Sequence, residues 1–424
     1  MTVRAGILVT GTEILTGLIT DRNGPWLSAR LAELGVEVAQ ISCVGDRPED
    51  LEATLVAMRD QGLDLVVTSG GLGPTADDLT AEIVARFAGR ELKLDEEMEA
   101  KIAAILERFA KRLKFDPEPL REANRKQAMI PEGATAIDPA GTAPGLVVPA
   151  GDLVVIVLPG PPRELQSMWA QAIETKAVRE VLDRTEPFET MALRKFGIPE
   201  SELAASLREI EREVDLSPLE VTTCLRRGEL HVDVRYRAGA EEAAEALKRG
   251  LVERHRRFVF SVEGESIEEI VFDLLQGKRI GLAESCTGGL LAVRLTNRPR
   301  SSGFFAGGVV SYSDEAKVEL LGVPEKLISE HGAVSLDVAE AMADGALERF
   351  GADVACSITG IAGPDGGSDE KPVGYVCFCV KERDGETILR DLELPGDRSE
   401  VRDRSSTVAL HLLRNLLRGE QPVR

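Results

Sequence analysis

The sequence predicts an α/β protein with two α/β domains and a small α+β module between them. Three observations carry this prediction. Apolar strand-like runs alternate with helically spaced segments in residues 1–170, residues 171–262 give paired strands and two amphipathic helices, and residues 263–424 return to the alternating pattern. Such alternation is typical of a parallel sheet covered by helices. At about 150 residues per domain, a chain of 424 residues has room for all three parts.

Composition narrows the class of protein. The chain has 51 Lys and Arg against 72 Asp and Glu, a net charge of −21, and 43% hydrophobic residues. A protein that coats nucleic acid needs the opposite charge, and a transmembrane helix needs about 18 consecutive apolar residues, which the chain lacks. No signal peptide is predicted, and the six cysteines are scattered without a C-x-x-C pair. We expect a cytoplasmic protein with reduced thiols, no membrane association and little affinity for nucleic acid.

Residues 1–170 form the first predicted domain. Buried strands are expected at residues 5–10, 36–44, 63–69, 145–148 and 153–158. Helical spacing and start signals predict helices at residues 25–34, 49–59, 76–87 and 95–113, and another that starts near residue 163.

The two later parts differ in their order of elements. Residues 171–262 are expected to be a KH-like or ferredoxin-like module with strands at 190–196, 219–225, 229–237 and 258–262 and helices at 200–212 and 241–254. Residues 263–424 are expected to have helices at 267–275 and 399–417 and strands at 279–283, 308–311, 352–357, 374–380 and 387–394.

A glycine-rich turn follows the first domain's third strand. The run T-S-G-G-L-G-P-T-A-D-D leads from the strand at 63–69 into the next helix. Backbone N–H groups at such a turn bind anions, and a helix N-terminus adds favourable potential. Asp77 and Asp78 are expected in the first helical turn. There they either cap the helix or hold a divalent cation that bridges substrate phosphates.

Other polar turns follow the strands of this domain. Each by itself is explained as a turn, and Asn23 is also a candidate N-cap. The carboxyl ends of parallel strands meet at one edge of a sheet, so their joint placement favours a pocket. The turns lie at residues 10–13, 21–23, 45–46, 141–145 and 159–164.

These motifs resemble the CinA family. The runs G-T-E-I-L-x-G, D-x-N, S-G-G-L-G-P-T-x-D-D, G-T-A-P-G and L-P-G-P-P-x-E are similar to its molybdopterin-binding fold, over nearly all of residues 1–170. The resemblance implies a metal-dependent pyrophosphatase that cleaves ADP-ribose to AMP and ribose 5-phosphate. It implies Mg²⁺, Mn²⁺ or Co²⁺, with K⁺ as a further candidate ion, at Asp77, Asp78 and Glu13. The implied nucleotide-binding residues are Gly70, Gly71, Gly73, Thr75, Asn23, Asp46 and Glu164.

A second strand, turn and helix open the last domain. The run A-E-S-C-T-G-G follows the strand at 279–283 and again predicts an anion site. Ser285 and Thr287 either cap the following helix or bind a phosphate. Small hydroxyl residues recur with one Tyr and one Lys in G-G-V-V-S-Y-S-D-E-A-K. With only four histidines in the chain, a hydroxyl nucleophile is expected to use Lys or Tyr as its base. Cys286 is a rival nucleophile, and equally a small packed residue.

The motifs A-E-S-C-T-G-G, S-S-x-x-F-x-G-G-V-V-S-Y-S-x-E-A-K and T-G-I-A-G-P-x-G-G resemble the C-terminal domain of the same family, over about residues 265–420. The resemblance implies a cofactor-free amidohydrolase of the pyridine-nucleotide cycle. It converts nicotinamide mononucleotide (NMN) and water to nicotinate mononucleotide and ammonia. Ser302 is implied as the nucleophile, with Tyr312 and Lys317 as its activating partners. The implied substrate or oxyanion residues are Ser285, Thr287, Gly288, Gly289, Thr359, Gly360, Gly363 and Gly366.

One position departs from the family pattern. Arg300 stands where the family usually has Gly, so a turn that needs positive φ would have to be built differently, which leaves Arg300 as a candidate phosphate ligand. Arg398 and Arg402 are expected to meet the phosphate of NMN or a neighbouring subunit. The resemblance also implies a homodimer or a larger homo-oligomer.

Two rival functions belong to other classes. One is an enzyme of molybdenum-cofactor synthesis that uses the first domain. The other is a non-enzymatic competence or DNA-damage factor that uses the KH-like module. A KH module clamps nucleic acid with a G-x-x-G loop, and residues 171–262 contain no such loop and have acid-rich helices.

Overall fold

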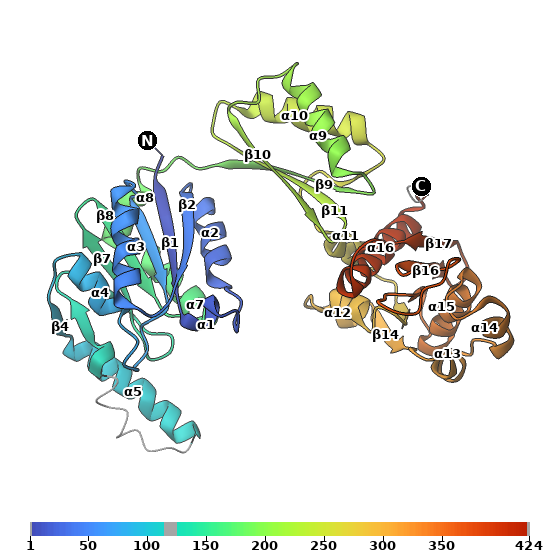
Figure 1. The fold of residues 1–424 in the computed structure, drawn as a ribbon, viewed down its shortest axis with the longest axis horizontal. Helices are drawn as coiled ribbons and strands as arrows, with labels where there is room; N and C mark the ends of the chain where they lie inside the picture. The colour runs from blue at the N-terminus through green and yellow to red at the C-terminus, as the bar shows by residue number, and fades with distance from the viewer. Residues whose placement is uncertain (1, 114–124, 422–424) are drawn as a thin grey trace. The chain divides into compact units, whose positions relative to one another are not determined.

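The computed structural model describes residues 2–113 and 125–421. Contacts divide the chain into two compact units, Met1–Glu189 and Thr190–Arg424 (Figure 1). Both units combine helices with β-sheets, which confirms the predicted α/β class. The middle module and the last domain share the second unit. The boundaries expected at residues 170 and 262 remain predictions. None of the helices in the described ranges is both long and apolar enough to cross a membrane.

The first unit alternates strands and helices as the sequence predicts. Its elements are β1 (Arg4–Thr10), α1 (Thr12–Leu15), α2 (Asn23–Glu33), β2 (Glu37–Val44), α3 (Pro48–Asp60), β3 (Leu65–Ser69), α4 (Thr80–Phe87), β4 (Leu92–Leu94), α5 (Glu96–Leu113), β5 (Met129–Pro131), β6 (Thr135–Ile137), β7 (Gly145–Ala150), β8 (Leu153–Leu158), α7 (Pro162–Ile173) and α8 (Lys176–Leu182).

The large sheet of this unit has the order β2-β1-β3-β8-β7-β6. Its first four strands are parallel, as the sequence predicts, but β7 pairs antiparallel with both β8 and β6, so the sheet is mixed. The short connection between β7 and β8 explains the difference, because a parallel pair needs a crossover of a dozen or more residues. The carboxyl ends of the four parallel strands still share one edge.

Alternate residues of each central strand enter two separate cores. Ile7 and Val9 of β1 pack with α2, α7 and α8 on one face, and Leu8 packs with α3, α4 and α5 on the other. A strand buried on both faces reads as a continuous apolar run, which is why the sequence revealed these strands clearly.

The second unit begins with a four-stranded sheet of order β10-β11-β9-β12. The six predicted elements of the middle module are present, each bound within one residue of the expected one. They are β9 (Glu189–Phe196), α9 (Glu200–Glu211), β10 (Leu219–Arg226), β11 (Glu229–Tyr236), α10 (Glu241–His255) and β12 (Val259–Ser261). The likeness to a KH module remains a prediction.

The rest of the second unit is a five-stranded sheet, β14-β13-β15-β16-β17, between two layers of helices. β13 pairs parallel with β14 and β15, and β16 pairs antiparallel with both β15 and β17. Its elements are α11 (Ile267–Leu274), β13 (Ile280–Glu284), α12 (Leu290–Thr296), the 3₁₀ turn η2 (Ser301–Gly303), β14 (Phe305–Val310), α13 (Asp314–Leu321), α14 (Glu325–His331), α15 (Leu336–Phe350), β15 (Val354–Gly360), β16 (Tyr375–Glu382), β17 (Thr387–Glu393) and α16 (Arg398–Arg418).

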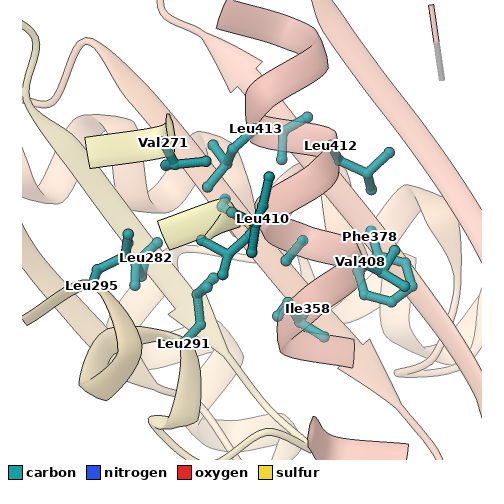
Figure 2. Close-up of a cluster of buried hydrophobic side chains, with 14 of the residues drawn as sticks. Val271, Leu282, Leu291, Leu295, Ile358, Phe378, Val408, Leu410, Leu412 and Leu413 are labelled. Carbon is teal, nitrogen blue, oxygen red and sulfur yellow. The ribbon is translucent and has the colours of Figure 1, made fainter. Parts of the chain in front are cut away.

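Helix α16 organises the larger core of this sheet. Leu410 and Leu413 are fully buried and pack with Leu282 of β13 and Ile358 of β15, and Figure 2 shows these side chains gathered around Leu410. The helix starts at a capping box, in which the Asp397 carboxylate accepts hydrogen bonds from the first backbone amides. α16 is therefore held along its whole length.

The middle module contains a buried polar chain of three side chains. Lys195 is fully buried, and its Nζ donates to His255 Nδ1 at 2.7 Å. The proton of the imidazole then lies on Nε2, which donates to Ser206 Oγ at 2.9 Å. Burial lowers the pKa of Lys195 to about 8 and that of His255 to about 4. Both of these hydrogen bonds can form only while His255 stays neutral, because its Nδ1 must accept from Lys195.

The stability of the second unit should therefore fall in acid. His255 is neutral in the folded unit but has a pKa near 6.5 when unfolded, so the unfolded chain gains a proton first. We expect the urea midpoint to decrease as the pH falls from about 6.5 towards about 4 and to level off below that. Measurement on the wild type and on H255Q tests this, because the variant should lose that part of the pH dependence. An unchanged profile in H255Q would contradict the assignment.

Candidate functional site

The first candidate site lies at the carboxyl edge of the parallel strands of the first unit. Asn23, at the start of α2, is 5% exposed and donates from Nδ2 to Ser69 Oγ at 2.8 Å and to the Gly160 carbonyl at 2.7 Å. One side chain thus joins the ends of β3 and β8. Its Oδ1 atom is buried, and within the described residues it has no hydrogen-bond partner. That oxygen is an unused acceptor on a residue that lines a hollow at this edge.

Asn23 is not the N-cap of α2, contrary to the expectation. The helix begins at Asn23 itself, and the carboxylate of Asp21 accepts the backbone N–H of Asn23 at 2.8 Å and of Gly24 at 3.1 Å. The D-x-N pattern therefore assigns capping to the Asp and leaves the Asn for the strand ends.

The Gly70-Gly71 turn needs glycine at both positions. Both residues have positive φ, and a Cβ on Gly70 would lie 2.6 Å from Thr10 Oγ1 and 2.7 Å from the Thr10 carbonyl oxygen. Gly160 approaches Gly70 from the other side. The turn is therefore bare backbone packed between two strand ends, as the sequence predicts for an anion-binding loop.

Asp77 and Asp78 lie in the loop before α4 and not in its first turn. The helix starts at Thr80, later than expected, because the preceding loop is built on side-chain contacts. The Asp78 carboxylate accepts the Thr75 N–H at 2.9 Å and the Thr75 hydroxyl, and Lys126 Nζ donates to the Thr75 carbonyl. Hydrogen bonding to Thr75 also lowers the pKa of the exposed Asp77. The Asp77 carboxylate is therefore ionised near neutral pH.

The carboxylates implied as metal ligands line different hollows. Glu13 lines one with Asp21, Asn23 and Ser69, whereas Asp78 lines another with Gly71, Gly73 and Gln127. Within the described residues, no three His, Cys, Asp or Glu side chains lie close enough together to hold a metal ion. Asp77 and Asp78 remain a pair of oxygen donors of the kind that Mg²⁺ and Mn²⁺ accept.

Two further predicted residues support the loops of this edge. The Asp46 carboxylate accepts the Thr12 N–H at 3.0 Å and the Thr12 hydroxyl at 2.7 Å, and so holds the start of α1. Glu164, in the first turn of α7, lies against Gly141, and burial raises its pKa. Their contact with a substrate remains a prediction.

The second candidate site lies at the carboxyl edge of β13, and its predicted anion cradle is already filled. Glu284 is buried, and its carboxylate accepts the backbone N–H groups of Gly289, Leu291 and Ala292 at 2.9–3.1 Å. These amides form the N-terminus of α12. The expectation that Ser285 or Thr287 caps this helix, or that the helix end binds a phosphate, was therefore wrong. The competing group, Glu284, stands inside the A-E-S-C-T-G-G motif itself.

Lys317 and Ser285 meet at this edge. Lys317, in the first turns of α13, is 2% exposed, and its Nζ lies 3.4 Å from Ser285 Oγ and 3.1 Å from the Ser311 carbonyl oxygen. Burial lowers the pKa of this amine. The hydroxyls of Thr287 and Ser311 are buried and lack hydrogen-bond partners among the described residues. A buried amine, a hydroxyl within its reach and two unused hydroxyls form the arrangement expected of a nucleophile and its base.

Helix α16 brings two arginines to the same edge. Arg398 donates to the Tyr312 hydroxyl at 2.7 Å and to the Gly363 carbonyl at 2.6 Å. Arg402 donates to the carbonyls of Cys286 and Thr287 at 3.1 and 2.9 Å. Within the described residues, neither guanidinium has an ion-pair partner, so both positive charges remain available to an anion.

The Thr359-Gly360 segment completes this edge. It ends β15, next to β13, and the Ser285 N–H donates to the Ile358 carbonyl at 2.9 Å. The Thr359 hydroxyl donates to the Ala333 carbonyl at 2.8 Å, which holds the loop before α15. A Cβ on Gly360 would meet Val376, and Gly288, Gly289, Gly363 and Gly366 all have positive φ.

Cys286 and Ser302 are placed less favourably for catalysis. Burial raises the pKa of the Cys286 thiol to about 12, and its side chain belongs to the apolar core. Ser302 is exposed in η2, before β14, whereas Ser285 follows β13. Since β13 and β14 are parallel, Ser302 lies at the opposite edge of the sheet, about 20 Å of strand away. Within a single copy of the protein, Ser302 therefore lies far from Lys317.

The site and fold together define a class of protein: two α/β parts, each with polar residues gathered at the carboxyl edge of a partly parallel sheet. Comparison with known proteins identifies the class further. The family model described as "CinA C-terminal domain" matches residues 264–417, and "Probable molybdopterin binding domain" matches residues 6–180.

Full-length relatives agree with both family models. A "CinA-like protein" of Mycobacterium sp. (strain JLS) is 58% identical over 419 residues, 98% of this chain and 99% of the relative. The "CinA-like protein" of Mycobacterium tuberculosis (strain H37Rv) is 56% identical over 426 residues, 99% of this chain and 98% of the relative. The chain belongs to the CinA family. A crystal structure of competence/damage inducible protein CihA from Agrobacterium tumefaciens is 39% identical, covers 37% of this chain and 99% of its own, and has a TM-score of 0.35.

Arg300 has a backbone conformation that favours glycine. Its φ is 71°, in the left-handed region, so the turn before η2 keeps the geometry that a glycine would adopt and is not rebuilt. A residue with a side chain is strained by about 1–2 kcal/mol in that region. A glycine avoids this strain, but its larger conformational entropy in the unfolded chain offsets part of the gain in stability. We expect R300G to be more stable than wild type by about 0.5–1 kcal/mol in urea unfolding. R298G, at a nearby position without positive φ, is the control and should be destabilised.

Proposed function

We propose that the C-terminal part of the chain hydrolyses the amide of NMN to nicotinate mononucleotide and ammonia. The single observation that carries this proposal is the buried Lys317 amine 3.4 Å from Ser285 Oγ. Membership of the CinA family supports the substrate class, and the two unpaired arginines at this edge suit the phosphate of a mononucleotide.

The proposed reaction uses Ser285 and not Ser302 as the nucleophile. A neutral Lys317, favoured by burial, accepts the proton of Ser285 Oγ as the oxygen attacks the carboxamide carbon. The proton then passes to the departing nitrogen, ammonia leaves, and an ester to Ser285 forms. Water attacks that ester with Lys317 again as the base, which releases the carboxylate and restores the serine. The Thr287 hydroxyl, buried and unpartnered, is available to donate to the developing oxyanion.

The other residues of this edge position the substrate in the proposal. Arg398 holds the Tyr312 hydroxyl at the mouth of the site, where Tyr312 is 58% exposed. Arg402 holds the backbone of Cys286 and Thr287, the two residues that follow the proposed nucleophile. The local cations also explain how a chain of net charge −21 would attract an anionic substrate.

The nucleophile can be identified by paired substitutions. We expect S285A to lose NMN deamidation by about a thousandfold or more, because Ser285 supplies the hydroxyl that contacts Lys317 in the described structure. S302A should retain most activity, since Ser302 is at the other edge of the sheet. The assay is ammonia release from NMN in the presence of EDTA, with the urea unfolding midpoint of each variant as the folding control. An inactive S302A beside an active S285A would show that a serine from a second copy completes the site.

We propose that the first domain cleaves the diphosphate of ADP-ribose with the help of a divalent cation. The Gly70-Gly71 turn, the unpartnered Asn23 Oδ1, the Asp77 carboxylate with its lowered pKa and the neighbouring Asp78 carboxylate support a site for a diphosphate. The oxygen donors Asp77 and Asp78 fit Mg²⁺, Mn²⁺ or Co²⁺, with substrate oxygens as further ligands. The cation, when bound, supplies charge neutralisation and an acidified water. Gly71 and Gly73 line the same hollow as Asp78, so their backbone would lie beside the phosphates.

The metal assignment is testable apart from the loop's structure. Asp78 also holds Thr75, so D78N changes both a carboxylate and a loop contact. T75V removes the hydroxyl contact and keeps the carboxylate. We expect D78N to weaken Mn²⁺ binding by tenfold or more in calorimetry and to reduce ADP-ribose cleavage, and T75V to keep Mn²⁺ binding within about threefold. Equal effects of the two variants would refute Asp78 as a ligand.

One observation favours a second candidate function for the first domain. Residues 6–180 match the molybdopterin-binding model, and the same edge would suit a pterin phosphate. Binding of molybdopterin by the purified protein, without cleavage of ADP-ribose, would favour a role in molybdenum-cofactor metabolism.

A further inference from the structure

A cavity of about 170 Å³ lies within the second unit, away from both candidate sites. It forms where the last residues of β9, the start of β12, the edge strand β17 and the second half of α16 meet. Its walls are mostly apolar, and three are aromatic: Phe196, Phe258 and Phe260. His411 stacks on Phe196 with ring centroids 3.8 Å apart, and its Nε2 donates to Glu229 at 2.7 Å. The aromatic wall is therefore held rigidly.

Three arginines surround this apolar cavity: Arg257, Arg390 and Arg414. Within the described residues, neither Arg257 nor Arg390 has an ion-pair partner, and Arg257 lies over the Phe258 ring at 5.9 Å. Arg414 pairs with the half-exposed Glu420 at 3.0 Å, while its buried Nε atom has no acceptor in the described structure. The cavity thus has more positive charge than its own carboxylates balance.

The position of Arg390 is unusual for a strand. Side chains of β17 alternate between solvent and the core, and Arg390 shares the inward face with Ile388 and Leu392, both of which pack against the main core. An apolar residue would satisfy packing there without burying a charge. A half-buried guanidinium without a carboxylate is what a site for an external anion requires.

We propose that this cavity binds a small aromatic carboxylate. The aromatic walls would contact the ring on its faces, and a planar carboxylate would accept paired hydrogen bonds from a planar guanidinium, with Arg390 and Arg414 as donors. The volume suits one ring with one anionic group, since pockets for larger ligands measure about 300–1,000 Å³. The proposal does not rest on the proposed catalytic function.

Such a ligand would contact both parts of the second unit. Phe196 and Phe258 belong to the middle module, while Arg390 and Arg414 belong to the last domain. The ligand would strengthen an existing junction in which Arg227 pairs with Asp403 at 3.1 Å. It would also touch the second half of α16, whose first turns hold Arg398 and Arg402 at the candidate active site.

Calorimetric titration of the full chain with benzoate tests the proposal. Benzyl alcohol, which keeps the ring, and acetate, which keeps the charge, are the matched ligands. We expect benzoate to bind at least about tenfold more tightly than either one, and R390Q to weaken benzoate binding by about tenfold or more. R208Q, at an exposed position of α9, should bind benzoate as the wild type does.

Two results would overturn the proposal. One is benzoate binding that survives R390Q and is lost in R398Q, which would place the ligand at the candidate active site. The other is no binding of benzoate at all by a chain whose urea midpoint is normal. R390K keeps the charge without the planar guanidinium and should bind benzoate with intermediate affinity. This variant tests the role of Arg390 even if R390Q does not fold.

Discussion

The parallel register of β13 with its two neighbours is the constraint on which the second unit's chemistry depends. Because parallel strands end at the same edge, Ser285, Ser311 and Thr359 are brought together from segments far apart in the chain. The same register sends Ser302 to the other edge. Strand direction therefore decides which serine lies beside Lys317: Ser285 does, and Ser302, at the other end of a strand, does not.

Buried charge is used in different ways in the two candidate sites. Glu284 satisfies the amides of α12 with a carboxylate from within the chain, so that helix end has no vacancy for a substrate anion. The first unit instead leaves its Gly70-Gly71 turn bare and keeps the Asn23 Oδ1 atom unpartnered. The two strand–turn–helix motifs look alike in sequence, but the amides of α12 donate to a carboxylate, whereas the Gly70 N–H donates to the Leu158 carbonyl at 3.0 Å. In the proposed reaction, the substrate phosphate would therefore be bound by the arginine side chains of α16.

Helix α16 links the features of the second unit. Its first turns carry Arg398 and Arg402, its middle supplies Leu410 to the main core, and its last turns carry His411 and Arg414 at the arginine-lined cavity. One helix therefore contacts both the second candidate site and the arginine-lined cavity.

The sequence by itself determined the α/β class, most strand positions, the glycine turn after β3 and the family to which the chain belongs, since these depend on local hydrophobic period and on short motifs. Only the tertiary structure decided which residues meet. The antiparallel β7, the late start of α4 and the capping by Asp21 and Glu284 all depend on partners distant in the chain. The pairing of Lys317 with Ser285 rather than Ser302 is of the same kind. Spacing along a chain cannot show at which edge of a sheet a side chain emerges, because that edge is set by the direction in which each strand is laid beside its neighbours.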